Sequence, residues 1–258
     1  MGLPDNVVPQ DAATVMLLRD GQAGIEVFMM RRNLDAEFVG GAYVFPGGKV
    51  DPDDGSDAVE RLCIGLDDVE ASRRLSLPRG GLAFWVAAVR ECFEEAGVLL
   101  ADGITDYAAL AVYRKTVHSG EVRLADMCET EGLLLTVGGI HYHSHWITPI
   151  GSQRRFDTRF FVALVPTQQT PVHDDAELIA SMWVRPIDAL DMYERGEIYL
   201  ITPTHRSLRS LLPYDFAADA VGAAAARTDV DVILPRVVDE PGGIRILIAG
   251  DVGYEEAL

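Results

Sequence analysis

Three glutamates stand close together in one segment of the chain: Glu91, Glu94 and Glu95. If residues 84–96 form a helix, this spacing places Glu94 and Glu95 within about 60° of Glu91 on one face. Like charges four residues apart destabilise a plain helix by about 0.2–0.5 kcal/mol. Carboxylate oxygens at this spacing suit Mg²⁺ or Mn²⁺, which would neutralise the repulsion. The segment therefore predicts a metal site, and the alternative is a solvated acidic face.

The opposite face of the same segment is apolar, which favours a helix packed on a sheet. Its members are Trp85, Val86, Val89, Cys92, Phe93 and Ala96. Gly97 follows at the position of a helix C-cap. We expect Trp85, like Trp183 in a later apolar run, to be a core residue and not a platform for substrate.

The elements that must position this helix are mainly short β-prone runs. They lie at residues 12–18, 25–30, 42–45, 133–137, 140–146, 159–165 and 181–184. Asp20-Gly21 predicts a hairpin between the first two runs, and Pro46-Gly47-Gly48 is expected to stop the third. Further helices are expected at residues 186–195, 204–212 and 217–226, and a closing hairpin at residues 232–238 and 244–248. This order predicts an α+β or α/β sandwich rather than a regular βαβ array.

The composition excludes several classes of function. Forty Asp and Glu against 22 Lys and Arg give a net charge of −18, which disfavours binding to nucleic acids and to anionic membranes. Cys63, Cys92 and Cys128 form no disulfide or zinc pattern, as is typical of a reducing compartment. No signal peptide is visible in residues 1–10, and no apolar run reaches the roughly 20 residues that span a bilayer. We therefore expect a soluble, cytoplasmic protein.

Residues 90–98 (Arg-Glu-Cys-Phe-Glu-Glu-Ala-Gly-Val) match every fixed position in the second half of the Nudix box. Residues 45–48 (Phe-Pro-Gly-Gly) resemble the loop that precedes that box. The chain is therefore identified as a member of the Nudix hydrolase superfamily. The resemblance implies an α/β/α sandwich with a mixed central sheet and a metal-dependent enzyme. We expect one domain over residues 1–258, with an insertion at 51–82 and a C-terminal helical and hairpin extension at 204–258.

The insertion interrupts the box itself. Counted from Gly48, the box's first Glu is either replaced by Asp54, to which we assign no role, or missing. Arg90 stands about 28 residues beyond the expected position 62. An interrupted box resembles the coenzyme A diphosphatase subgroup, as do residues 146–149, 154–161 and 250–254. One feature departs from it: Glu37 stands where another branch of coenzyme A hydrolases carries an Arg.

The resemblance implies a role for each residue of the box. Glu91, Glu94 and Glu95 would hold Mg²⁺ or Mn²⁺, and the catalytic set would be Glu91, Arg90 and Glu94. Arg90 would hold a glutamate in place from the second shell. Glu91 is the preferred general base, with Glu177 on a later loop as the alternative. The backbone of the Gly47–Gly48 loop would pass close to the helix and contact the substrate.

Several basic residues are candidates for binding substrate phosphates. Arg31 and Arg32 end a strand just before the glycine loop. A second basic patch contains Arg154, Arg155 and Arg159. The alternative is that these arginines only neutralise neighbouring acidic residues.

Three histidines alternate at positions 141, 143 and 145, so a regular strand would place them all on one side. Such a row could chelate a transition metal, but a solvated strand face is the more common outcome.

Three functions remain open. The chain would hydrolyse the diphosphate of coenzyme A or its acyl forms, or that of ADP-ribose, NADH or nucleotide sugars, or it would bind a nucleotide without cutting it. Loss of box carboxylates would mark a non-catalytic module, and here three remain. The expected partner is a small-molecule diphosphate, and a homodimer is left open.

Overall fold

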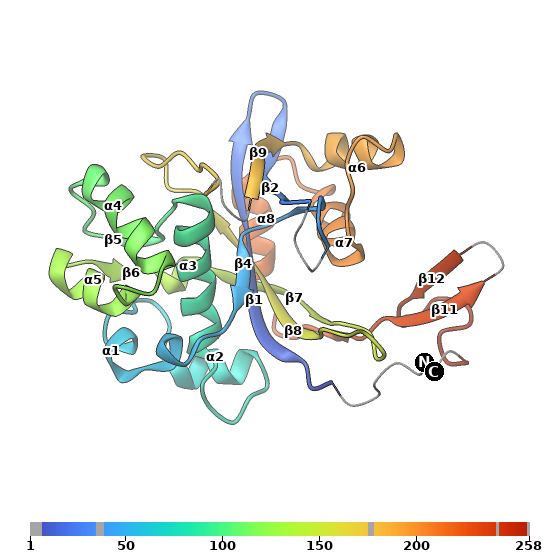
Figure 1. The fold of residues 1–258 in the computed structure, drawn as a ribbon, viewed down its shortest axis with the longest axis horizontal. Coiled ribbons are helices and arrows are strands. Elements are labelled where there is room, and N and C mark those ends of the chain that lie inside the picture. The colour runs from blue at the N-terminus through green and yellow to red at the C-terminus, as the bar shows by residue number, and fades with distance from the viewer. Residues whose placement is uncertain (1–6, 35–38, 175–177, 241–242, 257–258) are drawn as a thin grey trace.

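A mixed sheet of eight strands occupies the centre of the molecule (Figure 1). The computed structural model describes residues 7–34, 39–174, 178–240 and 243–256. The main path of the sheet runs β10-β7-β8-β1-β2-β3, with β4 also paired to β1 and β9 to β2. The strands are β1 (Gln10–Gly21), β2 (Gly24–Arg32), β3 (Tyr43–Val44), β4 (Gly47–Lys49), β7 (His141–Ile147), β8 (Phe156–Leu164), β9 (Leu178–Val184) and β10 (Val232–Ile233).

Strand β1 organises this sheet. It pairs in parallel with β8 along one edge, and antiparallel with β4 and then β2 along the other. Its side chains are apolar on both faces, because both faces are covered. Val15 and Leu17 belong to one hydrophobic core, whereas Met16 and Leu18 belong to the other.

Helices cover the two faces of the sheet (Figure 1). One core is closed by α1 (Asp57–Glu60), α2 (Asp68–Arg74), α3 (Leu82–Ala96), α4 (Tyr107–His118) and α5 (Leu124–Glu131). The other is closed by α6 (Pro186–Glu194), α7 (Thr202–Leu211) and α8 (Ala217–Ala225). The predicted α/β/α sandwich with a mixed central sheet is therefore confirmed.

Helix α3 agrees with the prediction for residues 84–96. It ends at Gly97, whose φ of 68° is a left-handed conformation that glycine adopts without strain. Trp85 is fully buried, and its indole donates a hydrogen bond of 2.8 Å to the carbonyl of Ile140. Its ring packs 4.6 Å from that of Phe161 on β8. The apolar face thus fixes α3 against the sheet and turns the glutamates the other way.

Residues 51–82 contribute short helices and no strand to the central sheet. They hold a 3₁₀ turn (Pro52–Gly55) followed by α1 and α2. The Asp68 carboxylate accepts hydrogen bonds from the backbone of Gly80 at 2.9 Å and of Leu82 at 3.0 Å. The segment is therefore tied back to the start of α3.

The glycine loop differs from its prediction. Gly47–Lys49 do not end the pairing but form β4 beside Ala12–Thr14 of β1. A Cβ on Gly47 would lie 2.4 Å from Thr14 Oγ1, so only glycine allows this approach.

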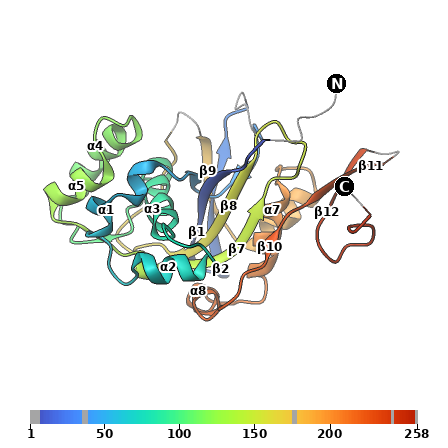
Figure 2. The ribbon, with the colours of Figure 1, turned by 90° about the horizontal axis from the view of Figure 1, so that it is seen from below.

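The predicted strand at residues 133–137 and the predicted closing hairpin have different outcomes. The expected strand at residues 133–137 is only the two-residue β6 (Leu134–Leu135), paired with β5 (Ala101–Asp102) in a separate small sheet. The predicted closing hairpin is confirmed as β11 (Arg236–Glu240) and β12 (Gly243–Leu247), and it extends away from the sandwich (Figures 1 and 2). Within the described residues, no helix is long and apolar enough to cross a membrane.

Candidate active site

Two of the three glutamates of α3, Glu91 and Glu95, lie against the glycine loop, whose residues Gly47–Lys49 form β4. Glu95 accepts a hydrogen bond of 2.8 Å from the backbone amide of Gly47. A Cβ on Gly48 would lie 2.4 Å from Oε1 of Glu91, so the loop backbone passes directly over that carboxylate. The close approach follows from the pairing of β4 with β1, because β1 lies under α3.

Arg90 lies among these carboxylates and is only 12% exposed. Its Nη1 donates to Oε1 of Glu91 at 2.9 Å and to Oε1 of Glu94 at 3.4 Å. Its Nη2 also donates to the carbonyl of Lys49 at 2.8 Å, next to the glycine loop. Arg90 therefore links the loop to two of the three glutamates.

Asp54 completes the arrangement, although we assigned it no role from the sequence. Its side chain is 2% exposed and accepts from Nε and Nη2 of Arg90 at 2.9 and 3.0 Å. The backbone amide of Asp51 donates a third hydrogen bond of 2.8 Å to it. Burial raises the pKa of Asp54, while Arg90 acts to lower it. Asp54 thus stands six residues after Gly48, where the uninterrupted box has its first Glu, and orients Arg90.

The electrostatics of the glutamates favour a bound cation. Burial raises the pKa of Glu91 to about 7, with Arg90 acting to lower it and Glu94 to raise it. Burial also raises the pKa of Glu94, against the effect of Arg90. The charged forms are therefore costly without a further positive charge. In the part of the chain that the structure describes, no three acidic, histidine or cysteine side chains already converge as a metal-binding group.

Helix α4 supports the acidic end of α3, a contact that no sequence motif indicated. Arg114 donates to the carbonyls of Glu94 and Glu95 at 2.8 and 2.7 Å, in the last turn of α3, where carbonyls do not pair within the helix. His118 Nδ1 lies 3.6 Å from Oε2 of Glu94. The only signal in the sequence was the capping residue Asp106 at the start of α4.

Arg31 and Arg32 end β2 and are separated by an irregularity in the pairing with β9. Arg31 lies opposite Tyr43 of β3, on the strand that leads into the glycine loop. The Nε atoms of both arginines are buried without a hydrogen-bond partner among the described residues.

The second basic patch divides between two environments. Arg155 donates to the carbonyls of Thr148 and Val7, and its own carbonyl pairs with Gln10 at the start of β1. This is four residues before Thr14, where β1 meets Gly47. Arg159 is 4% exposed and pairs with Asp157 and Asp11. Arg154 is exposed and directly precedes Arg155, before β8 begins.

The histidines do not share one face of β7, so that prediction was wrong. The register shifts between Tyr142 and Ser144, because His143 forms a bulge. His143 bonds to Ser210 of α7, on one side of the sheet. His145 bonds to Asp157 and lies beside the ring of Tyr142, which belongs to the core on the other side. Glu37 and Glu177 lie outside the described residues.

Comparison with known proteins agrees with this geometry. The family model for the NUDT19 Nudix domain matches residues 67–211, more than half of the chain. The match includes α3 and begins after the glycine loop and Asp54.

Three relatives share the name acyl-coenzyme A diphosphatase NUDT19. The chain is 27% identical to that of Gallus gallus, over 92% of this chain and 74% of the relative. It is 28% identical to that of Homo sapiens, over 90% and 73%, and 28% identical to that of Xenopus laevis, over 72% and 59%.

A solved structure extends the likeness to three dimensions. The crystal structure of a Nudix hydrolase from Alicyclobacillus acidocaldarius superposes with a TM-score of 0.71 at 28% identity, covering 84% of this chain and 96% of that one. The fold, the interrupted box and the sequence matches agree: the chain belongs to the NUDT19 Nudix domain family and is a Nudix hydrolase, an enzyme that cleaves diphosphate bonds.

Proposed function

We propose that this enzyme cleaves the diphosphate of coenzyme A and acyl-coenzyme A, giving 3′,5′-ADP and phosphopantetheine or its acyl form. The names of the three relatives support this substrate class. The observation that carries the proposal is the bond of Glu95 to Gly47, with Glu91 and Glu94 on the same face of α3. This bond holds the carboxylates beside the Gly47–Gly48 backbone, which has no side chain to keep a diphosphate away.

Glu91, Glu94 and Glu95 would hold the divalent ions, Mg²⁺ or Mn²⁺. The donor set fits, because hard carboxylate oxygens are the preferred ligands and burial has raised the pKa of Glu91 and Glu94. When bound, such ions neutralise the phosphoryl oxygens and help to position the attacking water. Arg90 bonds to Asp54 as well as to Glu91 and Glu94, so Asp54 limits how far the guanidinium can move toward the glutamates.

Glu91 is our candidate for the general base. In the metal-free protein burial raises its pKa to about 7, and a bound Mg²⁺ or Mn²⁺ would favour the carboxylate form that accepts a proton from water. The water oxygen bonds to one phosphorus and one of its protons passes to Glu91. The bridging P–O bond breaks, and its oxygen leaves with the other phosphate and keeps the electron pair. Gly47 holds Glu95 through its backbone amide while this happens.

Arg31 and Arg32 are our candidates for contacts with substrate phosphates. Each has an Nε without a hydrogen-bond partner among the described residues, and both lie at the end of β2. Arg154 and Arg155 remain weaker candidates, since Arg155 already bonds to two backbone carbonyls. We also propose that the chain forms a single domain and that the protein is cytoplasmic. The homodimer stays a hypothesis, which the molecular mass in solution would test.

Product analysis tests the substrate class. The purified enzyme is incubated with Mg²⁺ and, separately, coenzyme A, an acyl-coenzyme A, ADP-ribose and NADH. Release of 3′,5′-ADP from the first two at the highest kcat/KM supports the proposal. AMP from ADP-ribose or NADH at a higher kcat/KM would contradict it, and so would the absence of any product.

A further inference from the structure

A cleft of about 240 Å³ opens at the C-terminal end of α3. Its walls are the last turn of α3, one face of α4 and the loop that follows β8. Residues from these three walls are Phe93, Ala96, Leu110, Ala111, Gln168 and Val172. The loop is anchored to the helix, because Val172 donates its amide to the carbonyl of Ala96 at 2.9 Å.

The cleft adjoins the glutamates. Phe93 and Ala96 lie on the opposite face of α3, so the link to the glutamates runs along α4. His118, one turn beyond the cleft-lining Arg114, has its Nδ1 3.6 Å from Oε2 of Glu94. Arg114 lines the cleft and also bonds to the carbonyls of Glu94 and Glu95. A linear substrate with its diphosphate at these carboxylates therefore has one end within reach of the cleft.

The residues that line the cleft indicate which end of the substrate it binds. Among the described residues that line the cleft, Arg114 is the one charged side chain, and its guanidinium is engaged with the end of α3. Gln169 is similarly fixed, with its amide bonded to both the amide and the carbonyl of Leu99. A nucleotide with a 3′-phosphate needs cations that this cleft does not offer. Apolar walls with the exposed polar ends of Gln168, Thr170 and Tyr107 fit an uncharged chain that carries amide groups.

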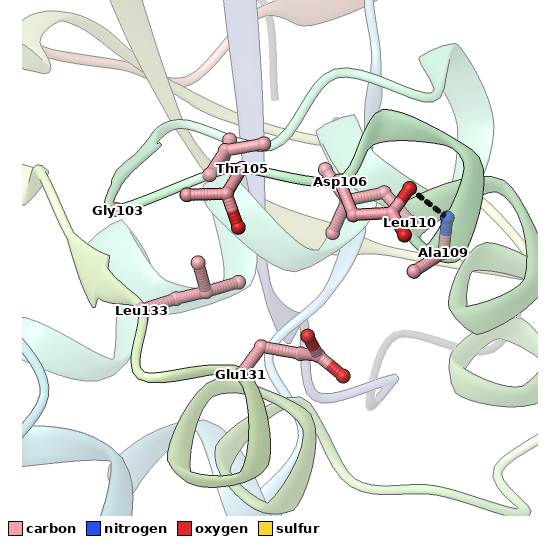
Figure 3. Close-up of a pocket in the computed structure, with 8 residues that line it drawn as sticks. Gly103, Thr105, Asp106, Ala109, Leu110, Glu131 and Leu133 are labelled. Atoms are coloured by element: carbon pink, nitrogen blue, oxygen red, sulfur yellow. Dashed lines mark hydrogen bonds between the residues drawn. The ribbon is translucent and has the colours of Figure 1, made fainter.

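The size agrees with this choice. Pockets for whole drug-sized ligands measure about 300–1,000 Å³, so 240 Å³ accommodates part of a long substrate. A second hollow near Leu110, between the start of α4 and Glu131, measures only about 10 Å³ and has room for one water (Figure 3). There the side chain of Asp106 is turned to the backbone of Ala109, as its cap of α4 requires (Figure 3).

We propose that the cleft between α3, α4 and the loop after β8 binds the uncharged arm of the substrate, an amide-containing chain with its acyl extension. This inference rests on the proposed function. It assigns the direction in which the substrate lies: the arm points past Gly97 into the cleft, and the nucleotide end lies away from it.

A tryptophan scan of α4 tests the assignment. Ala111→Trp fills the cleft from an exposed helix position, whereas Val112→Trp adds a comparable ring at a neighbouring position that is 67% exposed and does not line the cleft. For Ala111→Trp we expect KM for a medium-chain acyl-coenzyme A to rise about tenfold or more. The inhibition constant of 3′,5′-ADP, which lacks the arm, should stay unchanged. Val112→Trp should leave both constants as in the wild type.

Val172→Asp provides a second probe from the opposite wall, at a residue that is 51% exposed. The added charge should raise KM more for a long acyl chain than for coenzyme A itself. Equal KM values in Ala111→Trp, Val112→Trp and the wild type would overturn the inference, as would a parallel rise in the inhibition constant of 3′,5′-ADP. A wild type that cleaves neither coenzyme A nor acyl-coenzyme A would instead refute the proposed function, before any variant is compared.

Discussion

Asp54 and Arg90 form a buried ion pair with two hydrogen bonds, although they are 36 residues apart in the sequence. The pair spans the insertion, since Asp54 precedes α1 and Arg90 lies in the middle of α3. The helices of the insertion lie outside the central sheet, so they separate the two halves of the box in sequence without separating them in space.

Asp54→Asn should weaken both stability and catalysis. The amide keeps the size of the side chain but removes the most buried counter-charge of Arg90, while Glu91 and Glu94 stay close to its guanidinium. We expect a loss of about 1–3 kcal/mol in the free energy of unfolding, measured with urea, and a lower kcat with mutant protein that is fully folded. The exposed neighbour Asp53 provides the control as Asp53→Asn. Equal effects of the two substitutions would show that Asp54 does not orient Arg90.

The elements that local signals specify were predictable from the sequence. The first hairpin was predicted from Asp20-Gly21, although its turn lies two residues later at Gln22-Ala23, and Gly97 marked the end of α3. Turns and caps depend on a few adjacent residues. Helices α4 and α5 were missed, although Asp106 caps the first and Gly132 ends the second in a left-handed conformation. Their apolar faces are short, so periodicity alone gave a weak signal.

Contacts between distant segments were harder to predict. The sequence placed Glu91, Glu94 and Glu95 on one face, but the bond of Glu95 to Gly47 depends on how β4 pairs with β1. The bulge at His143 likewise depends on the register of β7 with β8, which no local pattern of residues specifies. Asp54 lies at the spacing from Gly48 that the box's first Glu has. Its role in orienting Arg90 became evident only from their contact in the structure.

Glu95→Gln tests whether the acidic face is a metal site. The amide oxygen can still accept from Gly47, so the fold should persist while one ligand charge is lost. We expect kcat to fall by at least about a hundredfold. Glu60→Gln removes the same charge at an exposed position of the insertion and should have almost no effect. Small and equal effects would identify the three glutamates as a solvated face.

Removal of metal provides an independent check. Exhaustive treatment with a chelator should abolish hydrolysis, and added Mg²⁺ or Mn²⁺ should restore it, because the buried carboxylates require a cation before they can accept a diphosphate. Mn²⁺ binding followed by calorimetry should weaken in Glu95→Gln and persist in Glu60→Gln. Activity that survives the chelator would contradict the proposed mechanism.

The stability of the metal-free protein should depend on the pH through Glu91. Its pKa is raised to about 7 in the folded state, so the folded protein holds this proton more tightly than the unfolded chain does. The resulting stabilisation is present below the ordinary glutamate pKa of about 4.5 and is lost as the pH rises through 7. Glu91→Gln removes the group, so its melting temperature relative to that of the wild type should increase from pH 5 to pH 8. Melting curves with a chelator measure this, and a difference that stays constant across the range would contradict it.

Gly48→Ala tests the close approach of the glycine loop to α3. The new Cβ would lie 2.4 Å from Oε1 of Glu91, and a glutamate side chain can swing away at little cost in stability. We therefore expect nearly the same melting temperature but a kcat reduced by about tenfold or more, because the displaced carboxylate can no longer serve as ligand or base. Gly55→Ala is the matched control, since its Cβ would meet only the Cβ of Ala83 at an ordinary 3.5 Å. If Gly48→Ala retained the wild-type kcat, the position of Glu91 under the loop would not matter for catalysis, and Glu94 and Glu95 would have to supply the chemistry without it.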